Sequence, residues 1–237
     1  MNVLITSATS ATAQIAAAAL TGTHTLRLTD LPGNTGTSDS GIFACDLNHE
    51  KPTDELVAGI DAIVNIGYQG QAGEATHLVD YHTRCMYNLL QAASDAGVSR
   101  YVNISTLRLF EDHEENLVVT ERWRSDPSAE DVELLSAHMA EAVCKEFARD
   151  LLIQVANLRL GWPFVPPDAA GTPGTPGSDD TAAISHELIG AAVAEALEST
   201  QLEQWQDIHV QSPVPYQRFI TGTAAKLLPG LAGRLSQ

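Results

Sequence analysis

Residues 3–13 read VLITSATSATA and decide the fold, because an apolar strand here leads through a turn of small hydroxyl side chains into an alanine-rich helix. The pattern predicts a strand at residues 3–6 and a helix from about Ser10 to Leu20. Further short, mainly apolar runs follow at residues 25–29, 42–45, 62–66, 101–105 and within 151–160. Strands that are apolar on both faces and separated by helices are typical of a parallel sheet with helices on both sides. We therefore predict a doubly wound α/β fold, whose ligands bind beyond the carboxyl ends of the strands.

The remaining segments give the helices and the expected boundaries. Helices are expected at residues 54–58, 75–96, 131–149 and 182–199, with a late strand at 207–210. Ser128 and Asp131 have the spacing of a capping box before the third of these helices. Residues 163–181 contain five prolines and predict a loop, which is either a lid or a plain insertion. We expect a single domain over residues 1–237, with a core at 1–161 and a small, loop-rich C-terminal appendage at 162–237.

The chain is strongly acidic, with 13 Lys and Arg against 30 Asp and Glu and a net charge of −17 over 237 residues. Nucleic acids and anionic membranes are bound through Lys and Arg, so this charge argues against both as partners. The sequence has no run of about 18 apolar residues that could span a membrane and no signal peptide at its start. Cys45, Cys85 and Cys144 lack metal-ligand or redox spacing. We expect reduced thiols, no metal site and a cytoplasmic location.

Five stretches occur in the order and strand context of one known family. They are residues 3–13, Leu28-Thr29-Asp30, Cys45-Asp46-Leu47, residues 98–106 and Leu158-Arg159-Leu160-Gly161. Together they resemble the extended short-chain dehydrogenase/reductase superfamily, and in particular its NAD-dependent epimerase/dehydratase branch. The resemblance covers residues 2–161 and implies a Rossmann-like domain that binds NAD. It implies that Asp30 holds the adenosine ribose, that Asp46 and Leu47 lie beside the adenine, and that Thr106 is the active-site hydroxyl.

The turn after the first strand departs from that family. Members carry T-G-x-x-G-x-x-G, whose glycines allow a tight bend and a close approach to the pyrophosphate. Ser7, Ser10 and Ala13 stand at the glycine positions here. Two interpretations stay open: the hydroxyls cap the helix and fill the phosphate site, or they add hydrogen bonds to a bound phosphate. The cofactor-binding candidates are Ser7, Thr9, Ser10, Ala11, Thr12, Asp30, Asp46, Leu47 and Gly67.

The catalytic pair departs as well. Members use Tyr-x-x-x-Lys on one helix face, with Tyr as acid/base and Lys lowering its pKa. If Glu141 matches the acid that follows the family lysine, Glu133 and Ala137 occupy these positions; a shift by one residue brings in Leu134 and His138. Neither alignment supplies the pair, so the usual hydride transfer is not expected. The catalytic candidates are Thr106, with Glu133 or His138 as substitute acid/base, although both could be ordinary helix residues.

Three functions remain open at this level. The first is a divergent, inactive member that binds a dinucleotide or related nucleotide as a sensor or regulator. The second is an oxidoreductase or epimerase for a sugar nucleotide or small carbonyl compound that uses Thr106 with a substitute acid/base. The third is a scaffold without a ligand. Tyr68, expected beside the nicotinamide, either stacks on a ligand or blocks the pocket. The resemblance also implies a homodimer through the helices at 75–96 and 131–149.

Overall fold

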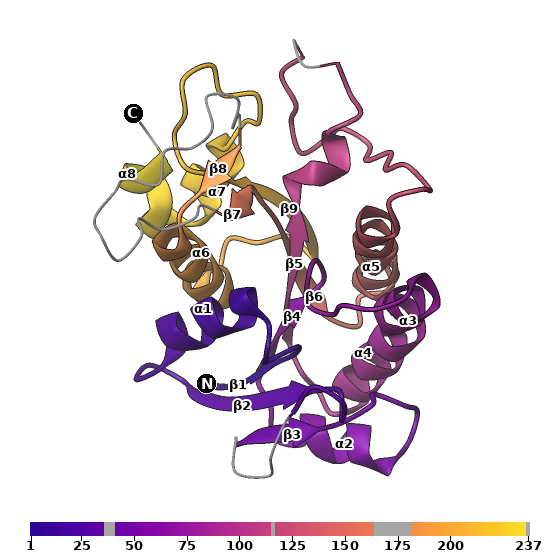
Figure 1. The fold of residues 1–237 in the computed structure, drawn as a ribbon. Coiled ribbons are helices and arrows are strands. Elements are labelled where there is room, and N and C mark those ends of the chain that lie inside the picture. Colours follow the sequence, from indigo (N-terminus) through magenta and orange to yellow (C-terminus); the bar gives the residue numbers. More distant parts are fainter. Residues whose placement is uncertain (36–40, 115–116, 164–181, 236–237) are drawn as a thin grey trace, which may run out of the picture.

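A single seven-stranded sheet forms the centre of the molecule (Figure 1). The computed structural model describes residues 1–35, 41–114, 117–163 and 182–235. Every strand pair in this sheet is parallel, and the strand order is β3-β2-β1-β4-β5-β6-β9. The strands are β1 (Asn2–Ile5), β2 (Thr25–Asp30), β3 (Ile42–Ala44), β4 (Ala62–Ile66), β5 (Arg100–Thr106), β6 (Gln154–Leu160) and β9 (Trp205–Val210). The winding reverses between β1 and β4, so the predicted doubly wound fold is confirmed.

Helices cover both faces of the sheet and enclose two apolar cores (Figure 1). One face packs against α1 (Ala11–Leu20) and α6 (His186–Glu198), with α7 (Gly222–Leu227), a 3₁₀ turn (Pro229–Leu231) and α8 (Ala232–Leu235) beside α6. The other face packs against α2 (Lys51–Val57), α4 (Met86–Asp95) and α5 (Val132–Arg149). A short 3₁₀ helix (Leu107–Phe110) follows β5. No helix among the described residues combines the length and the apolar character needed to cross a membrane.

Several elements differ from the predicted ones at their ends or in their interior. The helix expected at 75–96 consists of α3 (Ala75–Asp80), a π-helical turn (Tyr81–Cys85) and α4. The helix expected from residue 182 begins at His186, because Ser185 caps it and β8 (Ala183–Ile184) pairs with β7 (Trp162–Pro163). Asp131, rather than Ser128, caps α5 by accepting a hydrogen bond from the backbone of Leu134 at 3.0 Å. Most of the loop expected at 163–181 lies outside the described residues.

A ladder of buried amides crosses the sheet at one register. Asn65, Asn103, Asn157 and Asp207 are neighbours on β4, β5, β6 and β9. The hydroxyl of Thr6 donates to Asn65 at 2.9 Å, Asn65 to Asn103 at 3.0 Å, Asn103 to Asn157 at 2.9 Å, and Asn157 to Asp207 at 2.7 Å. Every donor points toward Asp207, so the amide dipoles stabilise its negative charge.

Candidate functional site

The turn after β1 closes on itself through serine side chains. Ser7 is buried and has a φ of 49°, a left-handed conformation that favours glycine. Ser10 caps α1, since its Oγ accepts a hydrogen bond from the backbone N–H of Ala13 at 3.2 Å. Ala13 is itself buried and allows α1 to pack closely on the sheet. The serines thus form an ordered strand–helix turn in which one residue takes a conformation that favours glycine.

Asp30, at the end of β2, is surrounded by donors from this chain. Its Oδ2 accepts from the backbone N–H and the hydroxyl of Thr9 at 2.9 and 2.7 Å. Its Oδ1 accepts from the backbone of Leu31 at 2.8 Å and from the side chains of Asn34 and Gln71 at 3.0 and 2.8 Å. Burial by itself would raise the pKa of Asp30, but the hydrogen bonds from Gln71, Thr9 and Asn34 hold that pKa below its usual range. The carboxylate is therefore ionised, and both of its oxygens already accept hydrogen bonds from this chain.

Gln71 joins Asp30 to the serine turn. Its Nε2 also donates to Ser7 Oγ at 2.9 Å, and its Oε1 accepts from Asn34 at 2.7 Å. Ser7 Oγ shares a further hydrogen bond with the hydroxyl of Tyr81 at 3.0 Å, and burial raises the pKa of Tyr81 to about 12. Sequence reasoning missed Gln71 and Tyr81, because nothing in a glycine-containing loop or in a π-helical turn indicates contacts with residues so distant in the chain.

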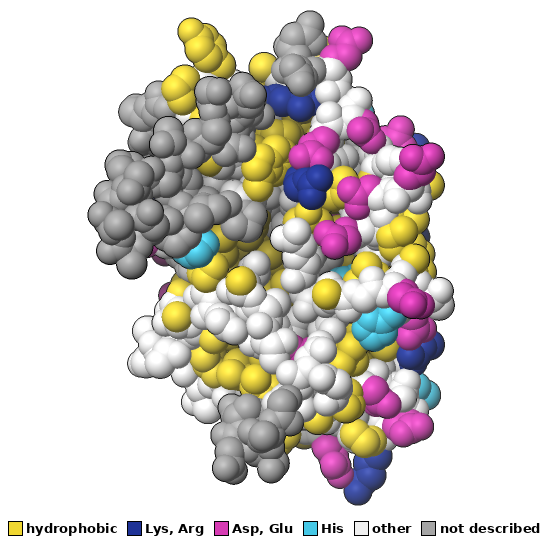
Figure 2. All heavy atoms as spheres, viewed as in Figure 1, with side chains coloured by type: hydrophobic (Ala, Val, Ile, Leu, Met, Phe, Trp, Pro, Cys, Tyr) yellow, Lys and Arg dark blue, Asp and Glu magenta, His cyan; other side chains and the backbone are white. Residues whose placement is uncertain are grey.

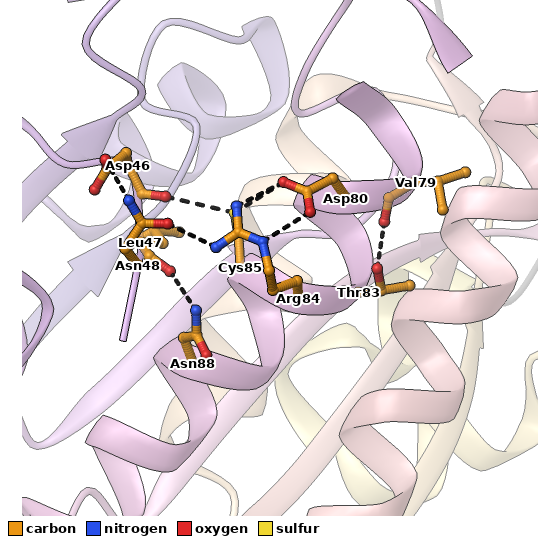
Figure 3. Close-up of polar contacts among 9 residues, drawn as sticks. All are labelled: Asp46, Leu47, Asn48, Val79, Asp80, Thr83, Arg84, Cys85 and Asn88. Atoms are coloured by element: carbon orange, nitrogen blue, oxygen red, sulfur yellow. Dashed lines mark hydrogen bonds and ion pairs between the residues drawn. The ribbon is translucent and has the colours of Figure 1, made fainter. Parts of the chain in front are cut away.

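Asp46 and Leu47 are tied to the π-helical turn (Figure 3). The backbone carbonyls of Asp46 and Leu47 accept from Cys85 Sγ at 3.4 Å and from Asn88 at 3.0 Å. Leu47 has a φ of 52° and a buried side chain, which packs in the core between the sheet and α4. Asp46 is exposed, and its carboxylate accepts from Asn48 at 2.6 Å. Only Asp46 of this pair presents a side chain to solvent.

The other cofactor-binding candidates lie around the same edge of the sheet. Ala11 is exposed and Thr12 half-buried in the first turn of α1. Gly67 follows β4 and is buried, and a Cβ at this position would lie 2.5 Å from Asn103 Oδ1, so only glycine fits there. The structure thus brings Ser7, Thr9, Ser10 and Asp30 together with Gly67 at the carboxyl ends of β1, β2 and β4.

These contacts decide whether the residues fit NAD in the pose that the resemblance implies. A ribose on Asp30 would need lone pairs that the donors from Thr9, Leu31, Asn34 and Gln71 already occupy. The loop after β4 is also pressed against the turn, since a Cβ at Gly70 would lie 2.8 Å from Ser7 Oγ. With these side chains in place, the site does not fit a dinucleotide in that pose.

A buried ion pair fixes the position of α5. Glu141 accepts two hydrogen bonds from the guanidinium of Arg159 at 2.9 and 2.6 Å and one from the hydroxyl of Ser105 at 2.6 Å. Burial by itself would raise the pKa of Glu141, but Arg159 holds that pKa below its usual range. Because Glu141 is held between β5 and β6, the positions one and two helical turns before it are fixed as well. Ala137, one turn before, faces the end of β5, and Glu133, two turns before, faces the solvent beside it.

The side chains at those two positions contain no phenol and no amine. Ala137 is completely buried, in an apolar cluster with Tyr68, Phe110 and Phe219. Glu133, in the first turn of α5, is exposed. Tyr68 is buried, and its hydroxyl accepts from Arg108 at 2.7 Å; burial raises its pKa. The space beside β5 is therefore filled by aromatic and aliphatic side chains.

The three catalytic candidates are not brought together. Thr106 is buried, and its Oγ1 accepts a hydrogen bond from the backbone of Arg108 at 3.2 Å. His138 accepts from or donates to Ser125 Oγ at 2.9 Å and lines a cavity of about 540 Å³. Glu133 lines a different cavity of about 620 Å³. Five residues of α-helix separate Glu133 and His138 by about 140° around the axis, so they face different sides of α5.

The cysteines and the acidic residues give no sign of a metal site. Cys45, Cys85 and Cys144 are buried and free. In the part of the chain that the structure describes, no group of three or more His, Cys, Asp or Glu side chains is arranged to hold a metal ion.

A parallel sheet of this order, with a helix after β1 and an acid ending β2, defines a protein of the dinucleotide-binding fold class. The family model for the NAD-dependent epimerase/dehydratase family matches residues 5–208, so the chain belongs to that family. No curated protein matches the chain in sequence.

Solved structures similar to the chain include two sugar-acid dehydrogenases and an epimerase. Glucuronic acid dehydrogenase from Chromohalobacter salexigens is 19% identical with a TM-score of 0.80, and the match covers 100% of this chain and 84% of that one. Uronate dehydrogenase from Agrobacterium tumefaciens is 17% identical with a TM-score of 0.78 and the same coverage. UDP-N-acetylglucosamine 4-epimerase from Bacillus cereus is 16% identical with a TM-score of 0.75, covering 97% and 92%. Likeness at this identity shows the shared fold.

Proposed function

We propose that this chain is a divergent member of its family that does not transfer hydride. The observation that supports this is the position of α5: Glu141 is held by Arg159 and Ser105, which leaves Glu133 and Ala137 at the positions of the family's Tyr and Lys. A glutamate in solvent and a buried methyl group cannot supply a phenol whose pKa is lowered by an adjacent amine. Thr106, Glu133 and His138 face different surroundings and do not replace that pair.

We propose further that the dinucleotide cleft is closed by the chain itself in the resting protein. Gln71 is 6% exposed and donates hydrogen bonds to both Ser7 and Asp30. A bound dinucleotide would need the turn at Ser7 and the carboxylate of Asp30 for its own contacts. Asn34 adds a second amide to Asp30. Opening the cleft would break these hydrogen bonds and leave a buried carboxylate short of donors until a ligand replaced them.

A second candidate function is a nucleotide-binding regulator, and the retained Asp30 at the end of β2 favours it. In that case a nucleotide would displace Gln71 and use Asp30 and the amino end of α1, without turnover. The two candidates differ in affinity, because the first predicts weak or no binding by the wild-type protein and the second predicts a working site.

Calorimetric titration of the nucleotide-free protein with NAD⁺ and NADH separates them. We expect no micromolar binding by the wild-type protein and measurable binding by Gln71→Ala, which frees a face of Asp30. Gln91→Ala is the matched control, since Gln91 lies on α4 and bonds only Asp95. Micromolar binding by the wild-type protein would refute the closed cleft and support the nucleotide-binding regulator instead. Formation of NADH from NAD⁺ and a uronate, the substrate class named for similar structures, would overturn the proposal.

We also propose a homodimer through α4 and α5. Tyr87 on the outer face of α4 is 52% exposed and contacts Phe147 of α5 with ring centroids 5.3 Å apart. An aromatic side chain exposed between two helices fits a helix-packing interface. Light scattering on the wild-type protein and Tyr87→Glu tests it, with a dimer expected only for the former.

A further inference from the structure

A second concave site lies beside α5. It is the cavity of about 540 Å³ between α5, the edge strand β9 and the segment at residues 121–125, and we call it the edge cavity. An adjoining cavity of about 650 Å³ shares Glu121, Arg122, Trp205 and Asp207 with it. Volumes of this size suit small organic ligands. None of the residues assigned above to the dinucleotide cleft lines either cavity.

The basic side chains that lack a partner gather here. Within the described part of the chain, nine of the 13 Lys and Arg residues bond a carboxylate or a backbone carbonyl, and four do not. Arg122, Arg124 and Lys145 line the edge cavity, and Lys226 lines the adjoining one. None of these four has an acidic side chain within ion-pair distance among the described residues. Figure 2 shows acidic side chains spread widely over one face of the molecule, with basic side chains scattered among them.

Two of the acidic side chains in the edge cavity already have ion-pair and hydrogen-bond partners within the chain. Glu141 is paired with Arg159, and Asp207 forms an ion pair with Arg159 at 3.2 Å and accepts hydrogen bonds from Asn157 and Trp205 at 2.7 and 2.9 Å. The lining therefore carries four basic and three acidic residues, a formal balance of +1 in a chain of −17. Such a local surplus of positive charge attracts anions and not cations.

Two unpartnered polar atoms belong to the same lining. The side chain of Arg159 is 6% exposed, and its Nη1 has no hydrogen-bond partner among the residues that the structure describes. Glu121 is half-buried, and its Oε1 also has none. A buried donor and a buried acceptor without partners cost free energy unless a ligand or water satisfies them. An anionic oxygen suits the arginine, and a hydroxyl donor suits the glutamate.

We propose that the edge cavity binds a small hydroxylated organic dianion. Its negative groups pair with Arg124, Lys145 and Arg122, and its hydroxyl donates to Glu121. Lys145 is placed for this role, because its ammonium group lies 5.6 Å from the centre of the Trp205 ring, which holds it over the cavity without neutralising it. The site is independent of the closed dinucleotide cleft and of the absent hydride chemistry.

Calorimetric titration of the full chain at low salt with malate and with glycerol 3-phosphate tests the proposal, and the two probes separate a carboxylate from a phosphate ligand. Binding of at least one is expected, with succinate, which lacks the hydroxyl, weaker than malate, and with glycerol silent. Lys145→Met and Arg124→Gln should each weaken binding at least tenfold, about 1.4 kcal/mol. Lys51→Met is the matched control, since Lys51 is an exposed lysine on α2 paired with Glu55.

Silence for both dianions would overturn the proposal. It would also be overturned if Lys145→Met and Arg124→Gln bound like the wild-type protein, or if Lys51→Met lost as much affinity as they do. Because all three replaced side chains are exposed, circular dichroism is expected to show wild-type folding for each variant. None of these outcomes depends on the NAD titration, so failure here and failure of the proposed function are distinguishable.

Discussion

Replacement of Ser7 by glycine is expected to destabilise the protein, although glycine is the residue that the backbone favours. Ser7 has a φ of 49°, and a left-handed conformation costs a non-glycine residue about 1 kcal/mol, which glycine would recover. If this recovered strain were the only effect, a glycine at position 7, as in the family's turn, would stabilise the protein. The side-chain hydrogen bonds of Ser7 oppose that gain.

Two buried groups depend on Ser7 Oγ. Tyr81 is 3% exposed, and its hydroxyl would lose the hydrogen bond with Ser7 Oγ, at a cost of about 1–2 kcal/mol. Gln71 keeps its bond to Asp30 and would lose one hydrogen bond, about 1 kcal/mol. After the recovered strain is subtracted, Ser7→Gly should lower the free energy of unfolding by about 1–2 kcal/mol.

Urea denaturation of a double-mutant cycle with Tyr81→Phe provides the assay. In the Tyr81→Phe background the hydrogen bond between these two side chains is already absent, so Ser7→Gly should be nearly neutral there. The coupling between the two positions is then about 1–2 kcal/mol. If Ser7→Gly stabilises the wild-type protein, or has the same effect in both backgrounds, the hydrogen bonds do not decide the stability of the turn and the reasoning fails.

Three further perturbations have expected signs. Glu141→Gln should destabilise by about 3 kcal/mol or more in denaturant titration, because it leaves Arg159 charged and buried, whereas Glu146→Gln at an exposed pair should change stability by less than about 0.5 kcal/mol. Burial lowers the pKa of His209 from 6.5 to about 3, so between these values the unfolded chain binds a proton that the native state does not bind, and stability falls as pH drops from about 6.5 toward 3. His209→Leu should make the melting temperature less dependent on pH across that window. An unchanged pH dependence would contradict the prediction. Asn103→Leu should cost about 2 kcal/mol or more on thermal unfolding, because it interrupts the amide ladder on both sides, and a neutral effect would show that the ladder is not important for stability.

The fold could be predicted from the sequence because burial on both faces leaves a readable pattern. All residues of β4 are buried, and residues 62–66 accordingly form a nearly continuous apolar run. The same holds for the central part of β5 and for β6, whose ends were placed within three residues. The helix at 75–96 was found as a whole, but its π-helical turn was not, since one extra residue per turn has no composition signal.

The candidate site was only partly predictable, because its decisive contacts join distant parts of the chain. Asp30 and the serine turn were identified from their places at strand ends. The hydrogen bonds of Gln71 were not predicted, because a glutamine in a loop predicts only solvent exposure, and its partners Ser7 and Asp30 are far away in sequence. Two alignments of the helix that became α5 stayed open from sequence, and the buried pair of Glu141 with Arg159 supplies a physical reason to prefer the one that uses Glu141.

The amide ladder explains why the edge cavity can stay cationic beside an aspartate. Asp207 accepts the last hydrogen bond of a chain of donors that begins at Thr6, accepts another from Trp205, and forms an ion pair with Arg159. The negative charge of Asp207 is thus stabilised from within the sheet without an ion pair to Lys145, whose ammonium group remains over the Trp205 ring. If Asn157 were replaced by leucine, Asp207 would lose one of its donors and draw Lys145 toward itself, and anion binding in the edge cavity should weaken although no lining residue had changed. An undiminished affinity in a folded Asn157→Leu protein would refute this coupling.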